Sequence, residues 1–307
     1  MKKVLITNAS YGMHSEKPMQ MFQDAGFDVT WIKGATKQQI LDHIADMDAL
    51  LVGVEPADAD VIAAGKKLQV ISKHGVGIDN IDSAAAESRG ILVKNAPGTN
   101  SDAVADYTFG LMLDAARGIS AGDRALRNGQ WARISGKSVW GKTIGIIGFG
   151  AIGRKLALRA KGFQMRVLAY DIFWNEEFAT EHGIERATLE QIYQECDFIS
   201  LHTALTPETK NMISLEQMKM MKPSAILINA ARGSIVNEED LYTALTTGLI
   251  AGAALDAFAV EPPPKETPLF ELDNVVVTPH LGAFSEDAMT LMSIVATQNI
   301  IDNVSRG

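Results

Sequence analysis

Short apolar runs alternate with longer segments of helical periodicity along almost the whole chain. In the first third, helices are expected to begin near four residues whose side chains can cap a helix, Ser15, Thr36, Asp58 and Ser83. Strands are predicted there at Lys3–Thr7, Asp28–Ile32, Ala49–Gly53, Leu68–Lys73 and Ile91–Lys94. Because regular alternation of strands and helices is typical of parallel sheets covered by helices, this part predicts an α/β domain.

A second series of the same kind fills most of the rest of the chain. Pro207 stands at a predicted first helical position, Ser214 and Gln217 resemble a capping box, and three acids follow Asn237. Gly248 is expected just beyond the end of the next helix. The predicted strands are Thr143–Ile147, Val167–Tyr170, Phe198–Leu201, Ala225–Asn229, Gly252–Asp256 and Val275–Val277.

The first strand of this second series enters a glycine-rich turn, GFGAIG, which is followed by a helical segment and a second strand that ends at Asp171. Gly148 permits the tight turn, Gly150 lets the backbone approach a pyrophosphate, and Gly153 lets helix and strand pack closely. Glycines also make turns elsewhere, but this order of strand, turn, helix, strand and acid indicates a dinucleotide site. Asp171 is placed for the ribose hydroxyls, and no arginine follows it in IFW, which favours NAD over NADP.

The order of these segments predicts two doubly wound domains, with a Rossmann NAD-binding domain inserted into a flavodoxin-like substrate domain. Two helical segments, Asn100–Arg117 and Ser120–Asn128, are interpreted as the link between the domains. The amphipathic segment Ser285–Val304 is expected to return to the first domain. The predicted substrate domain is therefore 1–98 plus 284–307, and the predicted NAD-binding domain is 99–283.

Composition excludes several classes of function. The 307 residues are 47% hydrophobic and 21% charged, as in ordinary globular proteins, and this length suggests two domains. A net charge of −9 without any basic block argues against nucleic acid as a partner, and no apolar run is long enough for a membrane span. The start, MKKVLITNAS, is interpreted as a strand and not a signal peptide. The single cysteine, Cys196, is expected to be a buried thiol, which favours the cytoplasm.

Three polar residues of complementary chemistry follow successive strands of the second series. Arg232, Glu261 and His280 each come after a predicted strand, and ligands of doubly wound sheets bind at the carboxyl ends of strands. Singly, each is equally well explained as a surface or loop residue. Together they suit one reaction, because a guanidinium can hold a carboxylate, an imidazole can transfer a proton, and a carboxylate can keep that imidazole charged. With a nicotinamide as hydride carrier, they predict interconversion of 2-oxo and 2-hydroxy acids.

Several longer motifs carry a resemblance to a known family. They are GFGAIG, LHTALTPET, INAARG, AALDAF followed by EP, TPHLGA, and KHGVGIDNID at Lys73–Asp82. In this order and spacing the chain resembles the D-isomer-specific 2-hydroxyacid dehydrogenase family nearly end to end, and most of all its D-3-phosphoglycerate dehydrogenase branch. The resemblance implies NAD as cofactor and a homodimer. It also marks His202 as a structural residue and not a catalyst.

The resemblance implies roles for individual residues. Arg232 matches the substrate-binding and catalytic arginine, His280 the acid/base, and Glu261 the carboxylate that pairs with it. Cofactor contacts are implied for Gly148, Gly150, Ala151, Ile152, Gly153, Asp171, Thr203, Ala230, Ala231, Asp256 and Gly282. Substrate contacts are implied for Lys73, His74, Gly75, Val76 and Gly77, with Val76 and Gly77 offering backbone amides to the substrate carboxylate. No metal site is expected.

Departures from the family pattern concern the substrate. Ala204 replaces a usual proline, and Gly53 stands where phosphoglycerate dehydrogenases often carry an arginine for the phosphate. Lys73, His74 and Arg133 are the cations left to bind a second anionic group. A phosphoglycerate dehydrogenase-like enzyme is therefore expected, with a hydroxypyruvate or glyoxylate reductase, or another D-2-hydroxyacid dehydrogenase, as the alternative.

A further alternative is an NAD-sensing scaffold without turnover. It is disfavoured because a sensor needs no proton donor such as His280. The sequence ends soon after this histidine, so feedback by serine through a C-terminal regulatory domain is not expected.

Overall fold

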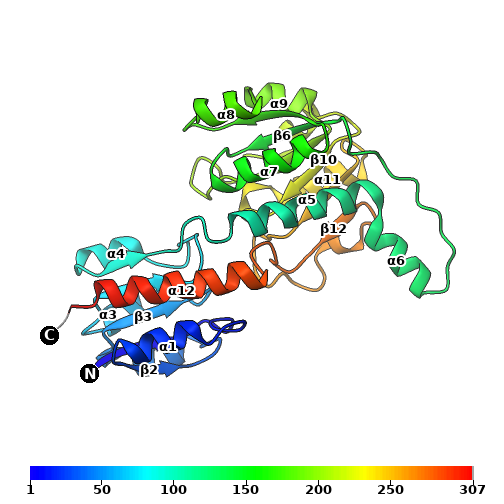
Figure 1. The fold of residues 1–307 in the computed structure, drawn as a ribbon. Coiled ribbons are helices and arrows are strands. Elements are labelled where there is room, and N and C mark those ends of the chain that lie inside the picture. Colours follow the sequence, from blue (N-terminus) through cyan, green and yellow to red (C-terminus); the bar gives the residue numbers. More distant parts are fainter. Residues whose placement is uncertain (306–307) are drawn as a thin grey trace. The chain divides into compact units, whose positions relative to one another are not determined.

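The computed structural model describes residues 1–305, and the chain divides into two compact units (Figure 1). Unit 1 consists of residues 1–100 together with the segment that begins at Phe284, and unit 2 is Ser101–Ala283. The sequence-based division placed the first boundary after residue 98 and the second after residue 283.

Unit 1 is built on a five-stranded parallel sheet with the order β2-β1-β3-β4-β5. This order is that of flavodoxin-like folds, as the sequence predicted. The two strands β3 and β4 are buried along their whole length, which explains their nearly continuous apolar sequences. The strands are β1 (Lys2–Ile6), β2 (Phe27–Trp31), β3 (Ala49–Val52), β4 (Val70–Lys73) and β5 (Leu92–Lys94).

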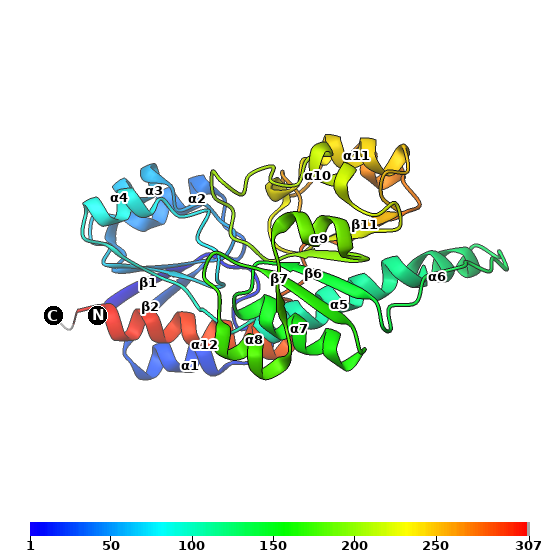
Figure 2. The ribbon, with the colours of Figure 1, turned by 90° about the horizontal axis from the view of Figure 1, so that it is seen from above.

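Helices cover both faces of this sheet (Figure 2). One face is covered by α1 (Lys17–Asp24) and α12 (Glu286–Asn303), and the other by α2 (Lys37–His43), α3 (Ala59–Ala64) and α4 (Ser83–Ser88). The return of the C-terminal helix to unit 1 is thus confirmed.

Three of the four predicted helix starts of unit 1 are capped by a side chain. Thr36 and Asp58 cap α2 and α3 as predicted, whereas α4 is capped by Asp82, one residue before the predicted Ser83. The helix α1 begins near Ser15 as predicted, but its N-cap is Glu16, which provides no side-chain cap, and a proline stands in its first turn. A proline has no N–H there, which reduces the need for a capping acceptor.

Unit 2 is built on a seven-stranded parallel sheet with the order β12-β11-β10-β9-β6-β7-β8. Counted from β6, this is the Rossmann order 3-2-1-4-5-6 extended by a seventh strand. The strand β8 was not predicted, since it has two exposed polar residues and no apolar pattern. The strands are β6 (Thr143–Ile147), β7 (Arg166–Tyr170), β8 (Glu185–Arg186), β9 (Phe198–Leu201), β10 (Ile226–Asn229), β11 (Gly252–Leu255) and β12 (Val275–Val277).

Two sets of helices cover this second sheet (Figure 2). The core on one face includes residues of α5, α7 and α8, and the core on the other includes residues of α9, α10 and α11. Their bounds are α5 (Ser101–Arg117), α7 (Ala151–Gly162), α8 (Glu176–His182), α9 (Leu189–Glu195), α10 (Leu215–Met220) and α11 (Glu238–Thr246). Short 3-10 turns lie at Ile44–Asp46, Gly233–Ile235 and Pro268–Glu271.

The helix α5 begins where the first part of unit 1 ends, packs on α7, β10 and β11, and contributes Phe109 and Met112 to the core of unit 2. One expectation about the helices of unit 2 was wrong. The segment after Thr206 forms turns and not a helix. There the Thr209 hydroxyl donates to the Ala204 carbonyl at 2.7 Å and accepts from the Thr206 N–H at 2.7 Å, so side chains close the turn.

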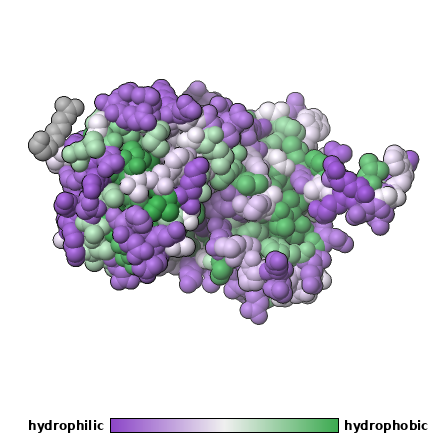
Figure 3. Space-filling model, turned by 90° about the horizontal axis from the view of Figure 1, so that it is seen from below, coloured by the Kyte–Doolittle hydropathy of each residue, from purple (hydrophilic) through white to green (hydrophobic). Residues whose placement is uncertain are grey.

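The next helix, α6 (Ile119–Arg127), protrudes from the body of unit 2 (Figure 1 and Figure 2). None of its residues is buried. Figure 3 shows hydrophobic side chains among hydrophilic ones on this protruding part, at the right of the view.

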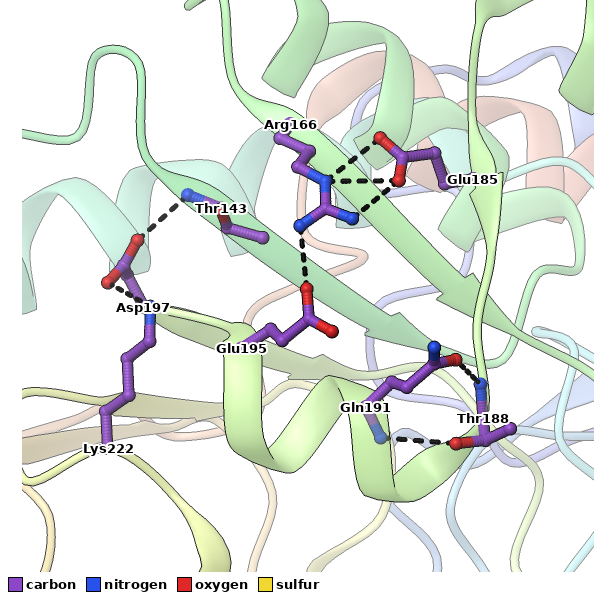
Figure 4. A network of polar contacts seen from close by, with 8 residues as sticks. All are labelled: Thr143, Arg166, Glu185, Thr188, Gln191, Glu195, Asp197 and Lys222. Atoms are coloured by element: carbon purple, nitrogen blue, oxygen red, sulfur yellow. Dashed lines mark hydrogen bonds and ion pairs between the residues drawn. The ribbon is translucent and has the colours of Figure 1, made fainter.

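A polar network fastens the edge of the sheet where β6, β7 and β9 begin (Figure 4). Arg166 forms ion pairs with Glu185 and Glu195, both at 2.7 Å. Asp197 accepts from the Thr143 N–H at 3.0 Å and pairs with Lys222 at 3.0 Å. The network joins the amino-terminal ends of these strands and leaves their carboxyl ends for a ligand.

Cys196 is fully buried, and burial raises the pKa of its thiol to about 12, as expected for a structural thiol. None of the helices within residues 1–305 combines the length and the hydrophobicity that a membrane crossing needs.

Candidate active site

The three glycines of the GFGAIG turn have different surroundings. Gly148 has a φ of +100°, and a Cβ there would lie 2.5 Å from the His202 carbonyl carbon. A Cβ on Gly153 would lie 2.1 Å from the Gly148 oxygen, so helix and turn touch at this point. A Cβ on Gly150 would meet no atom within 4 Å. The first and third glycines are therefore required by packing, while Gly150 faces open space that a ligand can fill.

The helix that follows this turn begins in a way that suits an anion. Gly150 is the N-cap of α7 and offers no side-chain cap, and the first turn contains no acidic residue. The first backbone N–H groups of a helix have no partner within the helix and carry the positive end of its dipole. The amides of Ala151 and Ile152 are thus placed for a pyrophosphate.

Asp171 lies directly beyond the end of β7, next to the glycine turn. One carboxylate oxygen accepts from the Phe149 N–H at 2.6 Å, and the other accepts from the Phe173 N–H at 2.8 Å. The Phe149 ring stacks on Trp174 with a centroid distance of 4.9 Å, which links the turn to the segment after Asp171 a second time. Because each carboxylate oxygen can accept two hydrogen bonds, Asp171 keeps acceptor capacity for ribose hydroxyls.

The other predicted cofactor residues of the neighbouring strands also lie at carboxyl ends. Thr203 follows β9, and its hydroxyl oxygen is buried without a hydrogen-bond partner among residues 1–305. Ala230 and Ala231 follow β10 and are partly exposed. A buried hydroxyl without a partner, an open glycine and an uncapped helix start together fit a dinucleotide, which would lie along this edge of the sheet.

Glu261 and His280 form a hydrogen-bonded pair in unit 2. The Glu261 carboxylate contacts His280 Nδ1 at 2.7 Å and accepts from the Phe258 N–H at 3.0 Å. The hydrogen bond with Glu261 raises the pKa of His280 above its ordinary value, although burial acts against it. Burial acts to raise the pKa of Glu261, but the hydrogen bonds from His280 and Phe258 outweigh it and the net shift is downward. The pair therefore favours a protonated imidazole beside an ionised carboxylate.

Asp256, which the sequence assigned to the cofactor, holds the loop that carries His280. The Asp256 carboxylate is 1% exposed and accepts from the Thr278 hydroxyl at 2.7 Å and from the N–H groups of Leu281 and Gly282, both at 2.8 Å. His280 sits inside this clamp with a φ of +55°, which is uncommon for a residue other than glycine. Contacts of Asp256 and Gly282 with the cofactor stay predictions, while the clamp is visible in the structure.

Arg232 lies between β10 and a 3-10 turn. Its guanidinium donates to the Ala231 carbonyl at 2.8 Å, and its own carbonyl accepts from the Asn229 amide at 2.9 Å. A Cβ on the next residue, Gly233, would lie 1.9 Å from the carbonyl carbon of Phe258. The arginine loop therefore packs on the loop that leads to Glu261. Arg232 also acts electrostatically on both members of the pair, lowering the pKa of each.

The predicted substrate residues are in unit 1, at the end of β4. Among residues 1–305, the N–H groups of Val76 and Gly77 have no hydrogen-bond partner, whereas the carbonyls of Gly75 and Val76 accept from Ala96 and Asn95. The loop is thus held by its carbonyls and presents two amides, which suits a carboxylate.

The ring of His74, which the sequence assigned to an anionic group of the substrate, is turned into unit 1. Its side chain is buried, and Nε2 contacts the Ser293 hydroxyl of α12 at 2.9 Å. Burial lowers the pKa of His74 to about 4, so the ring is neutral at physiological pH. Lys73 is also buried, and its ammonium donates to the Gly53 carbonyl and to Asn80 Oδ1. The sequence identified this loop but not the direction of its side chains.

Comparison with known proteins places this geometry in a family. The family model of the D-isomer specific 2-hydroxyacid dehydrogenase NAD binding domain matches residues 109–282, which is more than half of the chain. The chain belongs to the D-isomer specific 2-hydroxyacid dehydrogenase family. Its cofactor is accordingly NAD, and this dehydrogenase is an NAD-dependent oxidoreductase of D-2-hydroxy acids.

Individual relatives of this dehydrogenase carry two different names. The chain is 43% identical over 273 residues to a glyoxylate reductase of Korarchaeum cryptofilum, covering 87% of this chain and 82% of that protein. It is 41% identical over 304 residues to a D-3-phosphoglycerate dehydrogenase of Methanocaldococcus jannaschii, covering 98% of this chain but only 57% of that protein. The dehydrogenase therefore spans little more than half the length of the second relative.

A solved structure shares the fold of this dehydrogenase. The TT0316 protein of Thermus thermophilus superimposes with a TM-score of 0.88 and 35% identity, covering 96% of this dehydrogenase and 94% of that chain. Sequence reasoning named Asp256 as a cofactor residue but missed that it holds the His280 loop, and it did not single out Gly233. The pattern of an acid or a glycine directly after a strand could mark such residues, but it does not show which loop they contact.

Proposed function

We propose that this dehydrogenase interconverts a D-2-hydroxy acid and its 2-oxo acid, with Arg232, Glu261 and His280 as the residues that act on the substrate. The observation that supports this most is the 2.7 Å contact between Glu261 and His280 in the NAD-binding unit of a dehydrogenase family member. A charged imidazole held beside a carboxylate is the arrangement that proton transfer to a carbonyl oxygen needs.

Each residue has a distinct task in the reducing direction. The bound cofactor supplies the hydride. His280 uses Nδ1 for Glu261, so Nε2 remains to give its proton to the oxygen of the 2-oxo group. The Arg232 guanidinium can hold the substrate carboxylate through two parallel hydrogen bonds. In the oxidising direction the neutral imidazole takes the hydroxyl proton back.

Two substrate classes follow from the names of the relatives. One is a phosphorylated acid, as in a phosphoglycerate dehydrogenase-like enzyme, and the other is an unphosphorylated acid, as for a hydroxypyruvate or glyoxylate reductase. A non-catalytic NAD sensor is disfavoured, because it would have no use for the pair of Glu261 and His280.

The experiment is an assay of NADH oxidation with a panel of 2-oxo acids, using the wild-type enzyme and Arg232→Ala. We expect turnover by the wild type, and a loss on the order of 10²–10⁴-fold in kcat/KM for the variant with nearly unchanged NADH affinity. Arg117→Ala, which also removes a guanidinium but at the end of α5, is the control. Absence of turnover with every acid despite NADH binding would support the sensor and overturn the proposal.

We further propose that the enzyme is a cytoplasmic homodimer. The protruding segment of unit 2 supports the dimer, because Ile119, Leu126, Trp131 and Trp140 are between 59% and 81% exposed. Exposed apolar side chains gathered on one part of a protein mark an interaction surface. The single buried thiol of Cys196 is in keeping with the cytoplasm.

A further inference from the structure

Three segments form the central part of the carboxyl edge of the unit 1 sheet, where the ligand of a doubly wound sheet is expected. They follow β1 at Asn8, β3 at Gly53–Glu55, and β4 at His74–Ile78. If the enzyme acts on 2-oxo acids as proposed, the chemistry of this edge bears on which substrate tail it accepts.

The cation of the central segments, Lys73, points into the protein. Lys73 is 8% exposed, and its ammonium contacts the Gly53 carbonyl and, at 2.6 Å, the Asn80 side-chain oxygen. Asn80 in turn donates to the carbonyls of Gly53 and Glu55 at 3.1 and 2.5 Å. The ammonium therefore holds the turn after β3, and two of its three N–H donors are used for this within the protein.

A buried carboxylate lies beneath the same turn. Glu55 is 8% exposed and accepts from the Gly53 N–H at 2.7 Å and from the Thr7 hydroxyl at 3.2 Å. A dianionic group brought to this turn would be repelled by that carboxylate, and the Lys73 ammonium is held inside the protein by the Gly53 carbonyl and Asn80. The local charges thus do not favour a phosphate.

Position 53 cannot provide a cation in place of Lys73. A Cβ on Gly53 would lie 1.9 Å from the Asn8 amide nitrogen. Asn8 is held there, because its Oδ1 accepts from both the N–H and the hydroxyl of Ser10 at 2.8 Å. The space that a longer side chain would need is filled by a fixed amide.

The exposed side chains of these three central segments are apolar. Val54, at the tip of the fastened turn, is 82% exposed, and Val76 and Ile78 after β4 are 36% and 37% exposed. Other lysines of this edge lie on outer strands: Lys33 follows β2 and covers the Trp31 ring at 4.4 Å, and Lys94 ends β5. Neither of these strands neighbours β3.

We propose that the carboxyl edge of unit 1 selects 2-oxo acids with a short uncharged tail over phosphorylated ones, and that Val54 is the residue facing that tail. This inference rests on the proposed function and narrows it. The fixed turn of Gly53–Glu55 presents an apolar side chain, while the neighbouring ammonium and amide are used to hold the turn.

The first test compares kcat/KM for glyoxylate, pyruvate and hydroxypyruvate with that for 3-phosphohydroxypyruvate, all with NADH. We expect kcat/KM for the best acid with an uncharged tail to exceed that for the phosphorylated acid by on the order of 10–100-fold, mostly through a lower KM. A preference for the phosphorylated acid would overturn the inference and leave the proposed function intact. Absence of turnover with all four acids would instead remove the proposed function.

The second test introduces a cation at the exposed tip of the turn. Val54→Arg should raise kcat/KM for 3-phosphohydroxypyruvate about tenfold and lower it for glyoxylate, because a guanidinium binds phosphate oxygens in pairs. Val54→Leu, which keeps the tip apolar, should leave the ratio of the two acids unchanged. Thermal melting checks that both variants fold. An unchanged ratio in folded Val54→Arg would overturn the assignment of this position.

Discussion

His280 depends on one neighbour for its charge. Its ring is hydrogen-bonded to Glu261 at 2.7 Å, and this contact is the largest influence raising the pKa of the histidine. With His280 as the proposed proton donor, reduction of a 2-oxo acid needs the imidazolium, so the rate is full below the pKa of His280 and is lost as the pH rises through it. A raised pKa therefore extends the pH range of reduction upward.

Glu261→Gln should shift this range toward acid. With the carboxylate removed, burial and Arg232 lower the pKa of His280, so reduction is lost at a lower pH than in the wild type. We expect kcat/KM for reduction to fall about 10–100-fold at neutral pH, and the oxidation profile to move in the same direction.

The measurement is a pair of pH profiles of kcat/KM, one for each reaction direction. Glu266→Gln removes one charge from the exposed neighbouring loop and should leave both profiles in place. If the profiles of Glu261→Gln coincide with those of the wild type in shape and differ only in height, Glu261 does not set the charge of His280.

Candidate site residues could be predicted from the sequence where the residue type suits the chemistry and the position follows a predicted strand. Arg232, Glu261 and His280 could be selected because each follows a strand of a doubly wound sheet. The directions of Lys73 and His74 could not be predicted, because both depend on distant partners, Asn80 and Ser293, that only folding brings near.

At the scale of elements, the glycine turn before α7 must leave space for a ligand and must also pack closely against the helix. The sequence pattern alone does not show which glycine meets which requirement. Gly150 has a φ of −73°, which any residue adopts, and space around its missing Cβ. Gly153 has an ordinary helical position but touches the Gly148 oxygen. Gly150 therefore serves the ligand, and Gly153 serves the packing of the helix.

Gly150→Ala and Gly153→Ala should therefore fail in different ways. The first should raise the dissociation constant of NADH about tenfold or more while melting within about 2 °C of the wild type, because its methyl group enters only the ligand space. The second should cost about 1–3 kcal/mol of unfolding free energy through overpacking. NADH fluorescence titration and thermal melting measure the two effects. A large loss of stability in Gly150→Ala would show that this glycine, too, is required by the fold.

Elements were predictable where an apolar run or a local cap defines them. The strands β9 and β12 have the predicted bounds, and the capping residues Thr36 and Asp58 were identified. The expected helix after Thr206 failed because its proline signal was not accompanied by a buried apolar stripe. The close packing of α5 on the sheet of unit 2 was not predicted, although small residues such as Ala105 and Ala116 allow it.

At the scale of the whole molecule, one segment of unit 2 lacks a burial partner within the described chain. The helix α6 buries no residue, and Trp131 and Trp140 in the extended segment after it are 81% and 65% exposed. Burying a large aromatic side chain stabilises by roughly 1.5–3 kcal/mol, so leaving two of them in water forgoes a considerable stabilisation. A second copy of the chain offers the same apolar surface, which can pair with itself across a two-fold axis.

The enzyme should therefore have twice the chain mass of 33.1 kDa in solution, and the double variant Trp131→Glu/Trp140→Glu should have the mass of one chain. Light scattering after size-exclusion chromatography gives both masses. Leu92→Glu, at an apolar residue of unit 1 that is 45% exposed, is the matched control and should keep the doubled mass. Because the pair of Glu261 and His280 lies in other loops, a monomeric variant that still binds NADH would show that the segment serves assembly and not cofactor binding. A wild type with the mass of one chain would contradict the dimer, and a double variant that stays dimeric would place the contact elsewhere.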